Sequence, residues 1–227
     1  MIISHKHKCI FIKTEKTAGT SIEIALSKYC GPDDVITPIL PDDEEMRNNL
    51  GYRGPQNYLI PFNKYTNLDW LNLIFKRKRL AFFNHASAAY IMKYLDWDVW
   101  SSYFKFSFER NPWDKVVSWY YWRYLDEPRP DISEFVQSRE ANYIRGFELY
   151  SIRGELVVDK VYRFEQLKDS LADIAARVGL PEVPNLPKSK TNHRKDKRHY
   201  REILSDDDKE KIGKVYARSI AFFNYEW

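Results

Sequence analysis

The segment CIFIKTEKTAGTSIEIALSKYCG, from Cys9 to Gly31, places a strand, a turn and a helix in direct succession. Its first four residues, CIFI, are apolar with β-branched and aromatic side chains, which is typical of a buried strand. Further on, apolar residues recur with the spacing of one helical face, namely Ile22, Ala25, Leu26 and Tyr29. Gly31 and Pro32 predict the end of this helix. The segment therefore predicts the first strand and helix of an α/β fold.

The loop KTAGTS (residues 16–21) between this strand and helix has the composition of an anion site. The first N–H groups of a helix lack partners within the helix and carry the positive end of its dipole. Two small residues let the backbone approach a ligand, two hydroxyl residues add donors, and Lys16 adds a positive charge. The loop lacks the GxxxxGK[ST] pattern of triphosphate-binding loops. An ordinary turn followed by a helix cap is the alternative interpretation.

A second strand-to-helix junction follows in YFKFSFERNPWDKVVSWY (residues 103–120). Its first half alternates aromatic and polar residues, which predicts a strand, and Asn111 and Pro112 are a typical helix cap and first helical residue. Arg110 ends the strand, and Ser118 lies about two turns into the helix. A guanidinium and a hydroxyl so placed suit a terminal phosphate. Alternatively, Arg110 pairs with a carboxylate such as Asp114, and Ser118 faces the core.

The remaining pattern alternates strands and helices. We predict a helix over residues 84–95 with Asn84 as its cap, a strand over 155–164, a helix over 165–181, and a last helix over 205–223. This order predicts one domain, residues 1–227, with helices on both sides of a mainly parallel sheet. Residues 32–80 are rich in Pro, Gly, Asp and Asn, so we expect an irregular insertion with one short helix and a second candidate helix in NLDWLNLIFKRKR.

Composition limits the types of binding partner and the cellular compartment that we expect. The net charge is +4, and the basic segment KSKTNHRKDKRHYR (residues 188–201) indicates an anionic partner, unless it is only a solvated loop. Two cysteines form no disulfide framework, and no Cys/His cluster indicates a metal site. No apolar run is long enough for a signal peptide or a membrane span. We therefore expect a cytoplasmic protein.

The two junctions, KTAGTS and FERNPWDKVVSWY, together resemble the paired cofactor signatures of sulfotransferases that use 3′-phosphoadenosine-5′-phosphosulfate (PAPS). The segments FNHASAAYI, VYRFEQL and YARSIAFFNYEW resemble the carbohydrate-type branch of that family, in a bacterial-like soluble form. The resemblance spans nearly the whole chain and is weakest over residues 32–80. It implies a three-layer, P-loop-like sulfotransferase fold with PAPS as donor, no metal requirement and no nucleic-acid partner. The acceptor it implies is a hydroxyl of a carbohydrate or glycan-like molecule, with residues 32–80 shaping the acceptor site.

The resemblance also implies roles for individual residues. The residues implied to surround the 5′-phosphosulfate are Lys16, Thr17, Ala18, Gly19, Thr20 and Ser21. Those implied to hold the 3′-phosphate are Arg110 and Ser118, with Lys190 and Arg194 of the basic segment as candidates beside Lys195 and Arg198. Lys16 is also the candidate to meet charge on the leaving group. Glu15 departs from the family pattern, in which proline often precedes the lysine, and we expect its carboxylate to point away from the site.

The acceptor hydroxyl needs a base, and histidine suits this role near neutral pH. The resemblance favours His85 as the catalytic base, with Glu109 and Glu165 as alternatives, although Glu165 also suits a structural role beside Arg163. The aromatic run WYYW (residues 119–122) cannot all face one core, so part of it can stack on a base or a sugar ring, whereas packing explains the rest.

Two other functions compete with this interpretation. A nucleotide-dependent small-molecule kinase needs a triphosphate loop and a magnesium ligand, and neither is evident in the sequence. A non-enzymatic polyanion-binding module needs only the basic segment, and its binding weakens steeply with salt.

Overall fold

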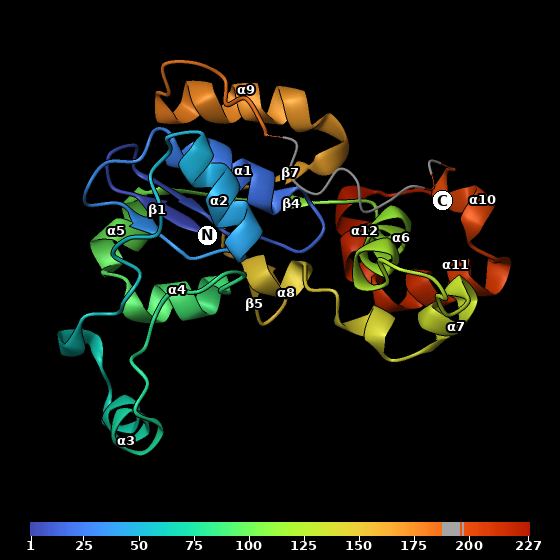
Figure 1. The fold of residues 1–227 in the computed structure, drawn as a ribbon, viewed down its shortest axis with the longest axis horizontal. Helices are drawn as coiled ribbons and strands as arrows, with labels where there is room; N and C mark the ends of the chain where they lie inside the picture. Colours follow the sequence, from blue (N-terminus) through green and yellow to red (C-terminus); the bar gives the residue numbers. More distant parts are fainter. Residues whose placement is uncertain (188–195, 197) are drawn as a thin grey trace.

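A computed structural model describes residues 1–187, 196 and 198–227 of the chain. The central sheet contains β3 (Val35–Ile36), β1 (Ile2–Ser4), β2 (Cys9–Phe11), β4 (Phe104–Glu109) and β7 (Lys160–Arg163), in that spatial order. A separate hairpin pairs β5 (Ser151–Ile152) with β6 (Glu155–Leu156). Helices flank the central sheet, so the protein has an α/β fold (Figure 1).

The central sheet is mixed and not mainly parallel as predicted, because only two of its four strand pairings are parallel. β2, β4 and β7 run parallel to one another, whereas β1 runs antiparallel to both of its neighbours, β2 and β3. Four strands therefore share one direction, and β1 is the reversed strand. The sequence did not indicate β1, because the polar residues 5–8 resemble a tail. They form the turn of a β1–β2 hairpin instead, with Lys8 at a φ of 48°.

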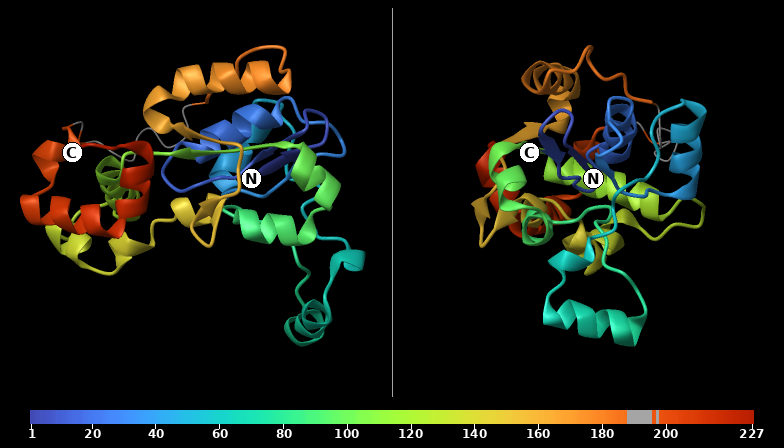
Figure 2. Two further views of the ribbon diagram at one scale, coloured as in Figure 1. Left: turned by 180° about the vertical axis from the view of Figure 1, so that it is seen from behind. Right: turned by 90° about the vertical axis from the view of Figure 1, so that its left-hand side faces the viewer.

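Helices cover the two faces of the sheet with separate apolar clusters. α1 (Gly19–Ser27) and α9 (Leu167–Val178) pack on one face, where Phe106 of β4 stacks on Phe104 and meets Phe108 edge to face. The opposite face is covered by α4 (Ala88–Tyr94), α5 (Trp97–Ser102) and α8 (Phe147–Tyr150). Figure 2 shows both layers from two further sides. The predicted apolar face is confirmed in part: Ile22 and Leu26 of α1 belong to the cluster on the sheet, whereas the helix ends at Ser27, so Tyr29 lies beyond it.

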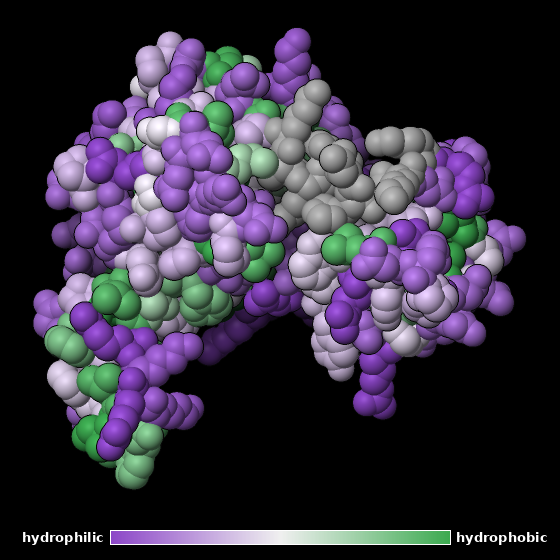
Figure 3. All heavy atoms as spheres, in the orientation of Figure 1, coloured by the Kyte–Doolittle hydropathy of each residue, from purple (hydrophilic) through white to green (hydrophobic). Residues whose placement is uncertain are grey.

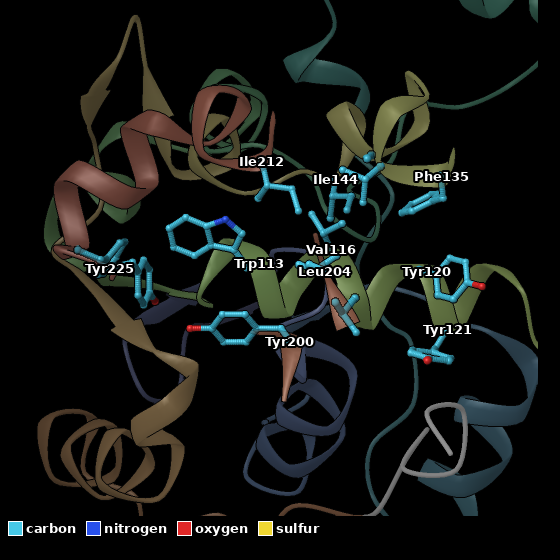
Figure 4. Close-up of a cluster of buried hydrophobic side chains, with 14 residues drawn as sticks. Trp113, Val116, Tyr120, Tyr121, Phe135, Ile144, Tyr200, Leu204, Ile212 and Tyr225 are labelled. Atoms are coloured by element: carbon cyan, nitrogen blue, oxygen red, sulfur yellow. The ribbon is translucent and has the colours of Figure 1, made fainter. Parts of the chain in front are cut away.

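A helical lobe lies beyond the carboxyl end of β4 (Figure 1). Its helices are α6 (Pro112–Arg123), α7 (Ile132–Gln137), α10 (Tyr200–Ile203), α11 (Asp206–Val215) and α12 (Ala217–Phe223). Figure 4 shows its core, in which Trp113 and Val116 of α6 face Ile212 of α11. The indole N–H of Trp113 donates to the carbonyl of Lys209 at 3.1 Å. α6 therefore begins at the sheet edge and ends inside the helical lobe, which joins the two parts of the protein.

Three boundaries differ from those predicted. The helix predicted from Asn84 begins at Ala88, because the hydroxyl of Ser87 caps it. The predicted strand over 155–164 divides into β6 and β7, because a turn moves the chain from the small hairpin into the central sheet. The last predicted helix is two helices that meet at Tyr216. By contrast, the caps at Asn111 and Ser205 and the helix end at Gly179 are confirmed.

Residues 32–80 contain more regular structure than predicted. They contribute β3 to the sheet, α2 (Pro41–Asn49) beside α1, and α3 (Asn67–Lys76) on an excursion away from the body (Figures 1 and 2). Single 3-10 turns complete the described elements: η1 (Phe62–Lys64), η2 (Glu140–Tyr143) and η3 (Phe164–Gln166). No helix within the described residues combines the length and apolar character that a bilayer span requires.

Candidate functional site

A cavity of about 490 Å³ lies where the sheet meets the helical lobe. Its walls come from the loop after β2, the start of α1, the start of α2, the segment before α4, and the second half of α6. β2 and β4 are adjacent parallel strands, so both strand-to-helix junctions open at the same edge of the sheet. The cavity has the size of an ordinary small-ligand site.

The loop after β2 has a strained backbone at two positions. Lys16 and Ala18 have left-handed φ values of 60° and 57°, whereas Thr17 between them does not. Such alternation forms a concavity of N–H groups that suits an anion. α1 begins at Gly19 with no side-chain cap. Gly19 is required sterically, because a Cβ there would lie 2.6 Å from Cγ of Lys13.

The four polar side chains of the loop divide between the interior and the cavity. Thr17 is fully buried, and its hydroxyl pairs with that of Thr14 at 2.9 Å. Thr20 and Ser21 line the cavity, as do Lys16, Ala18 and Gly19. The Nζ atom of Lys16 lies 5.1 Å from the centroid of the Trp122 ring. Of the six loop residues implied to hold the phosphosulfate, all except Thr17 thus line the cavity.

The carboxylate of Glu15 is engaged by Arg145. One oxygen accepts from Nε and Nη2 of Arg145 at 3.0 and 2.9 Å, and the other accepts from the Arg145 backbone N–H at 2.7 Å. The backbone N–H of Glu15 in turn donates to the Arg145 carbonyl at 3.1 Å. Although Glu15 belongs to the cavity wall, this bidentate pairing offsets its negative charge beside a candidate anion site.

Arg110 connects the two junctions. It donates through Nε and Nη2 to one oxygen of Asp114, at 2.8 and 2.6 Å, so the ion pair considered as an alternative is present. Its Nη1 also donates to the carbonyl of Lys16 at 3.1 Å, and the guanidinium lies 4.3 Å from the centroid of the Phe164 ring. Asp114 and Phe164 therefore hold Arg110 against the anion loop, on the wall of the cavity.

α6 divides its residues between the cavity and the core. Ser118 is half-buried and lines the cavity instead of facing the core. Trp119 and Trp122 also line it, with ring centroids 5.0 Å apart, whereas Tyr120 and Tyr121 belong to the core of the helical lobe. The aromatic run is therefore split, as the sequence predicted, and two of its four rings are placed to meet a ligand.

His85 lies in a turn before α4 and faces the same cavity. Its Nδ1 lies 3.0 Å from the carbonyl of Lys13, and a carbonyl only accepts, so Nδ1 carries the proton and Nε2 is the basic nitrogen. Burial, assisted by the positive charge of Lys13, lowers the pKa of His85 to about 3. The imidazole is therefore neutral at neutral pH. Its tautomer is set by the residue that leads into the anion loop.

The pKa of His85 predicts a pH dependence of stability. Because the folded state binds this proton less readily than the unfolded chain, stability is complete above about pH 6.5 and is lost as the pH falls toward about 3. Asparagine can replace the Nδ1 donor and tolerates the φ of 59° at this position. We expect the unfolding free energy of the native protein, relative to that of His85→Asn, to fall by at most about 1.4 kcal/mol per pH unit below pH 6.5. Urea unfolding at several pH values measures it, and a constant difference contradicts the lowered pKa.

The two alternative bases lie outside the cavity wall. Glu109 is buried, and its carboxylate binds Nζ of Lys115 at 2.8 Å and the hydroxyl of Tyr150 at 2.9 Å. Glu165 accepts from the backbone N–H of Asn111 at 2.7 Å and from the hydroxyl of Tyr225 at 3.3 Å. Both carboxylates thus hold the second junction in shape.

The basic segment is described only in part. Lys190, Arg194 and Lys195 lie outside the described residues. Arg198 forms an ion pair with Asp196 at 2.7 Å, and Asp196 also accepts from the hydroxyl of Tyr121 at 2.9 Å. This contact attaches residues 196 and 198 to the end of α6.

The sequence did not indicate six residues of the cavity wall as site residues: Lys13, Thr14, Leu40, Asp43, Asn84 and Phe164. Leu40 and Asp43, at the start of α2, belong to the segment expected to shape the acceptor site. Asn84 was predicted to cap a helix, yet its Oδ1 is buried with no hydrogen-bond partner among the described residues. The sequence could not distinguish Asn84 as a residue of the cavity wall from Asn84 as a helix cap, because a short polar side chain suits both roles.

The fold and the cavity define an α/β protein with a pocket at the carboxyl ends of parallel strands, lined by the loop that the sequence predicted to bind an anion. Over 89 residues the chain is 35% identical to a protein of Archaeoglobus fulgidus described as an uncharacterized protein, covering 37% of this chain and 74% of the archaeal one. The chain therefore belongs to the same family as this archaeal protein. No family model matches the chain. No solved structure matches it either.

Proposed function

We propose that the protein is a PAPS-dependent sulfotransferase that transfers a sulfuryl group to an acceptor hydroxyl. The observation that carries the proposal is the meeting of the anion loop, Arg110, Ser118 and His85 on one cavity. Two anion-type junctions at one sheet edge suit a donor with charged groups at both ends, and the resemblance of both junctions to PAPS signatures points to the same donor.

In this proposal the start of α1 and the loop bind the 5′-phosphosulfate. The N–H groups after Ala18, the hydroxyls of Thr20 and Ser21, and the ammonium of Lys16 supply the donors. Arg110 and Ser118 bind the 3′-phosphate. The ion pair with Asp114 orients the guanidinium of Arg110 on the cavity wall. Trp119 and Trp122 supply aromatic faces for the base or for the acceptor.

His85 is the proposed base. Its Nε2 takes the proton of the acceptor hydroxyl as the acceptor oxygen bonds to sulfur and the bond from sulfur to the bridging phosphate oxygen breaks. Lys16 stabilises the negative charge that this bridging oxygen gains. A bound anion close to the imidazole raises the pKa of His85, which increases its basicity when the donor is present.

The acceptor in this proposal is a hydroxyl of a carbohydrate or glycan-like molecule. Leu40 and Asp43, at the start of α2, and Asn84, beside His85 in the chain, are further residues of the cavity wall. A buried amide oxygen without a described partner can accept a hydrogen bond from a second sugar hydroxyl. These residues are the proposed acceptor side.

Thermal unfolding with nucleotides tests the donor site. Adenosine 3′,5′-bisphosphate without magnesium is expected to stabilise the protein by about 2.7 kcal/mol at a concentration 100-fold above its Kd. ATP with magnesium is expected to produce no comparable increase in Tm. The reverse pattern favours a small-molecule kinase and rejects the sulfotransferase, and equal, strongly salt-dependent effects favour a polyanion-binding module. A screen of acceptors with sulfur-labelled PAPS then identifies which product gains the label.

A further inference from the structure

α3 presents an apolar face to solvent, and its one buried residue is the polar Asp69. Four apolar side chains form this outer face: Leu68, Leu71, Ile74 and Phe75 are 66%, 50%, 67% and 81% exposed. Asp69 on the opposite side is buried against α4, where it accepts from the hydroxyl of Tyr94 at 3.1 Å. A surface helix normally has the opposite arrangement, with apolar residues toward the core. The outer face is therefore an unpaired apolar surface.

Backbone hydrogen bonds join the two ends of the segment that carries α3. Its two ends pair through the N–H of Ile60 with the carbonyl of Leu80 at 3.0 Å, and through the N–H of Phe82 with the carbonyl of Tyr58 at 2.7 Å. A capping box formed by Thr66 and Asp69 fixes the start of the helix. The inverted orientation thus follows from specific hydrogen bonds at the polar side, which hold the outer face away from the body.

A run of four cations begins at the last residue of this helix. Lys76, Arg77, Lys78 and Arg79 are all exposed, and Arg79 stacks on Phe62 at 4.4 Å. Figure 3 shows hydrophobic and hydrophilic surfaces side by side over this part of the molecule. An exposed apolar helix face with adjacent lysine and arginine is the pattern of helices that lie in the interface of an anionic bilayer.

We propose that α3 docks the protein on an anionic lipid surface. The outer face enters the boundary between headgroups and acyl chains, and the four cations bind lipid phosphates beside it. Figures 1 and 2 show α3 at the tip of its excursion, so the helix can reach this depth while the rest of the molecule stays in water. The proposal does not depend on the enzymatic activity proposed above.

Charge favours a bilayer over a second copy of the chain. In a two-fold dimer the same positively charged patch faces itself, so the four cations of each copy oppose association, most strongly where the two α3 helices run parallel. A single convex helix also presents no groove for a partner element. An anionic lipid surface matches both the apolar face and the positive charge.

Co-sedimentation of the full chain with vesicles tests the proposal. We expect binding to vesicles of phosphatidylcholine mixed with phosphatidylglycerol, weak binding to phosphatidylcholine alone, and release by high salt. Leu71→Asp is expected to lower binding to the mixed vesicles about tenfold or more, because it places a charge in the apolar face. Lys78→Glu is expected to lower it by a similar factor. The matched control is Leu125→Asp, since Leu125 is 47% exposed but follows α6 in the helical lobe, and it should bind as the native protein does.

Each other outcome decides against the proposal. Absence of vesicle binding by the native protein overturns it, as does equal loss in the Leu71→Asp and Leu125→Asp variants. Equal binding to both vesicle types removes the role of the four cations. If the native protein is instead a dimer that Leu71→Asp converts to a monomer in sedimentation velocity, the occupant of the outer face is a second copy. Circular dichroism of each variant verifies that it remains folded.

Discussion

Lys16→Ala is expected to lower the rate of sulfuryl transfer by about 10²–10³-fold, because it removes a charge aimed at the leaving group. The ammonium of Lys16 reaches the cavity from a loop whose conformation depends on other contacts, including those of Thr14, Thr17 and Arg110. The backbone φ of 60° at this position costs alanine no more than lysine. The variant should therefore fold normally and lose kcat. Turnover of sulfur-labelled PAPS and thermal unfolding measure the two properties separately.

Lys28→Ala provides the matched control for this experiment. Lys28 lies just after the last turn of α1 and pairs on the surface with Glu182, far from the cavity wall. Each substitution removes one lysine near an end of α1, so an effect of the lower net charge alone would appear in both variants. Full activity of Lys16→Ala would reject the role of the anion loop, whereas equal losses in the two variants would reject the specific role of Lys16.

Glu109→Ala is expected to destabilise the protein by about 3–5 kcal/mol, because it leaves a buried lysine without its counter-charge. Glu109 and Lys115 are 1% and 2% exposed. The carboxylate also accepts from the hydroxyl of Tyr150 at 2.9 Å and from the backbone N–H of Arg110 at 3.0 Å. Equilibrium unfolding in urea measures the loss. This result would assign Glu109 to the structure of the second junction and not to the proton transfer.

A double variant separates the buried charge from general disruption. When Glu109→Leu is combined with Lys115→Met, no unpaired ion remains, so the loss should be smaller than for Glu109→Ala alone. Glu210→Ala removes the exposed pair with Lys214 in α11 and should cause no measurable change. Normal stability but lost turnover in Glu109→Ala would instead support Glu109 as the base.

Local sequence patterns predicted the two strand-to-helix junctions well. The cap at Asn111, the capping box at Ser205 and the left-handed end at Gly179 all lie where the residues place them, since these signals depend on short-range hydrogen bonds. Predictions were wrong where a distant contact decides the structure. β1 forms because it pairs with β2 and β3, and the last predicted helix divides at Tyr216, whose hydroxyl donates to the carbonyl of Ala141.

The candidate site was predictable as two separate halves. Parallel pairing of β2 with β4 explains why the anion loop and Arg110 lie together, and alternation of strands and helices already indicates such an edge. The engagement of Glu15 was not predictable, because its partner Arg145 lies in a distant loop. Nor was the burial that lowers the pKa of His85.

The sequence alone therefore determined the α/β pattern, the two anion-type junctions and the residues that compose them, because backbone propensities and caps act over a few residues. Tertiary structure decided which of these residues share a cavity, which nitrogen of His85 is basic, and which side of α3 faces solvent. Each of these depends on groups brought together from distant parts of the chain: the carbonyl of Lys13 for His85, and the hydroxyl of Tyr94 for Asp69 of α3. Such a contact produces no repeating pattern in the sequence, because a single hydrogen bond between distant segments involves only one residue from each.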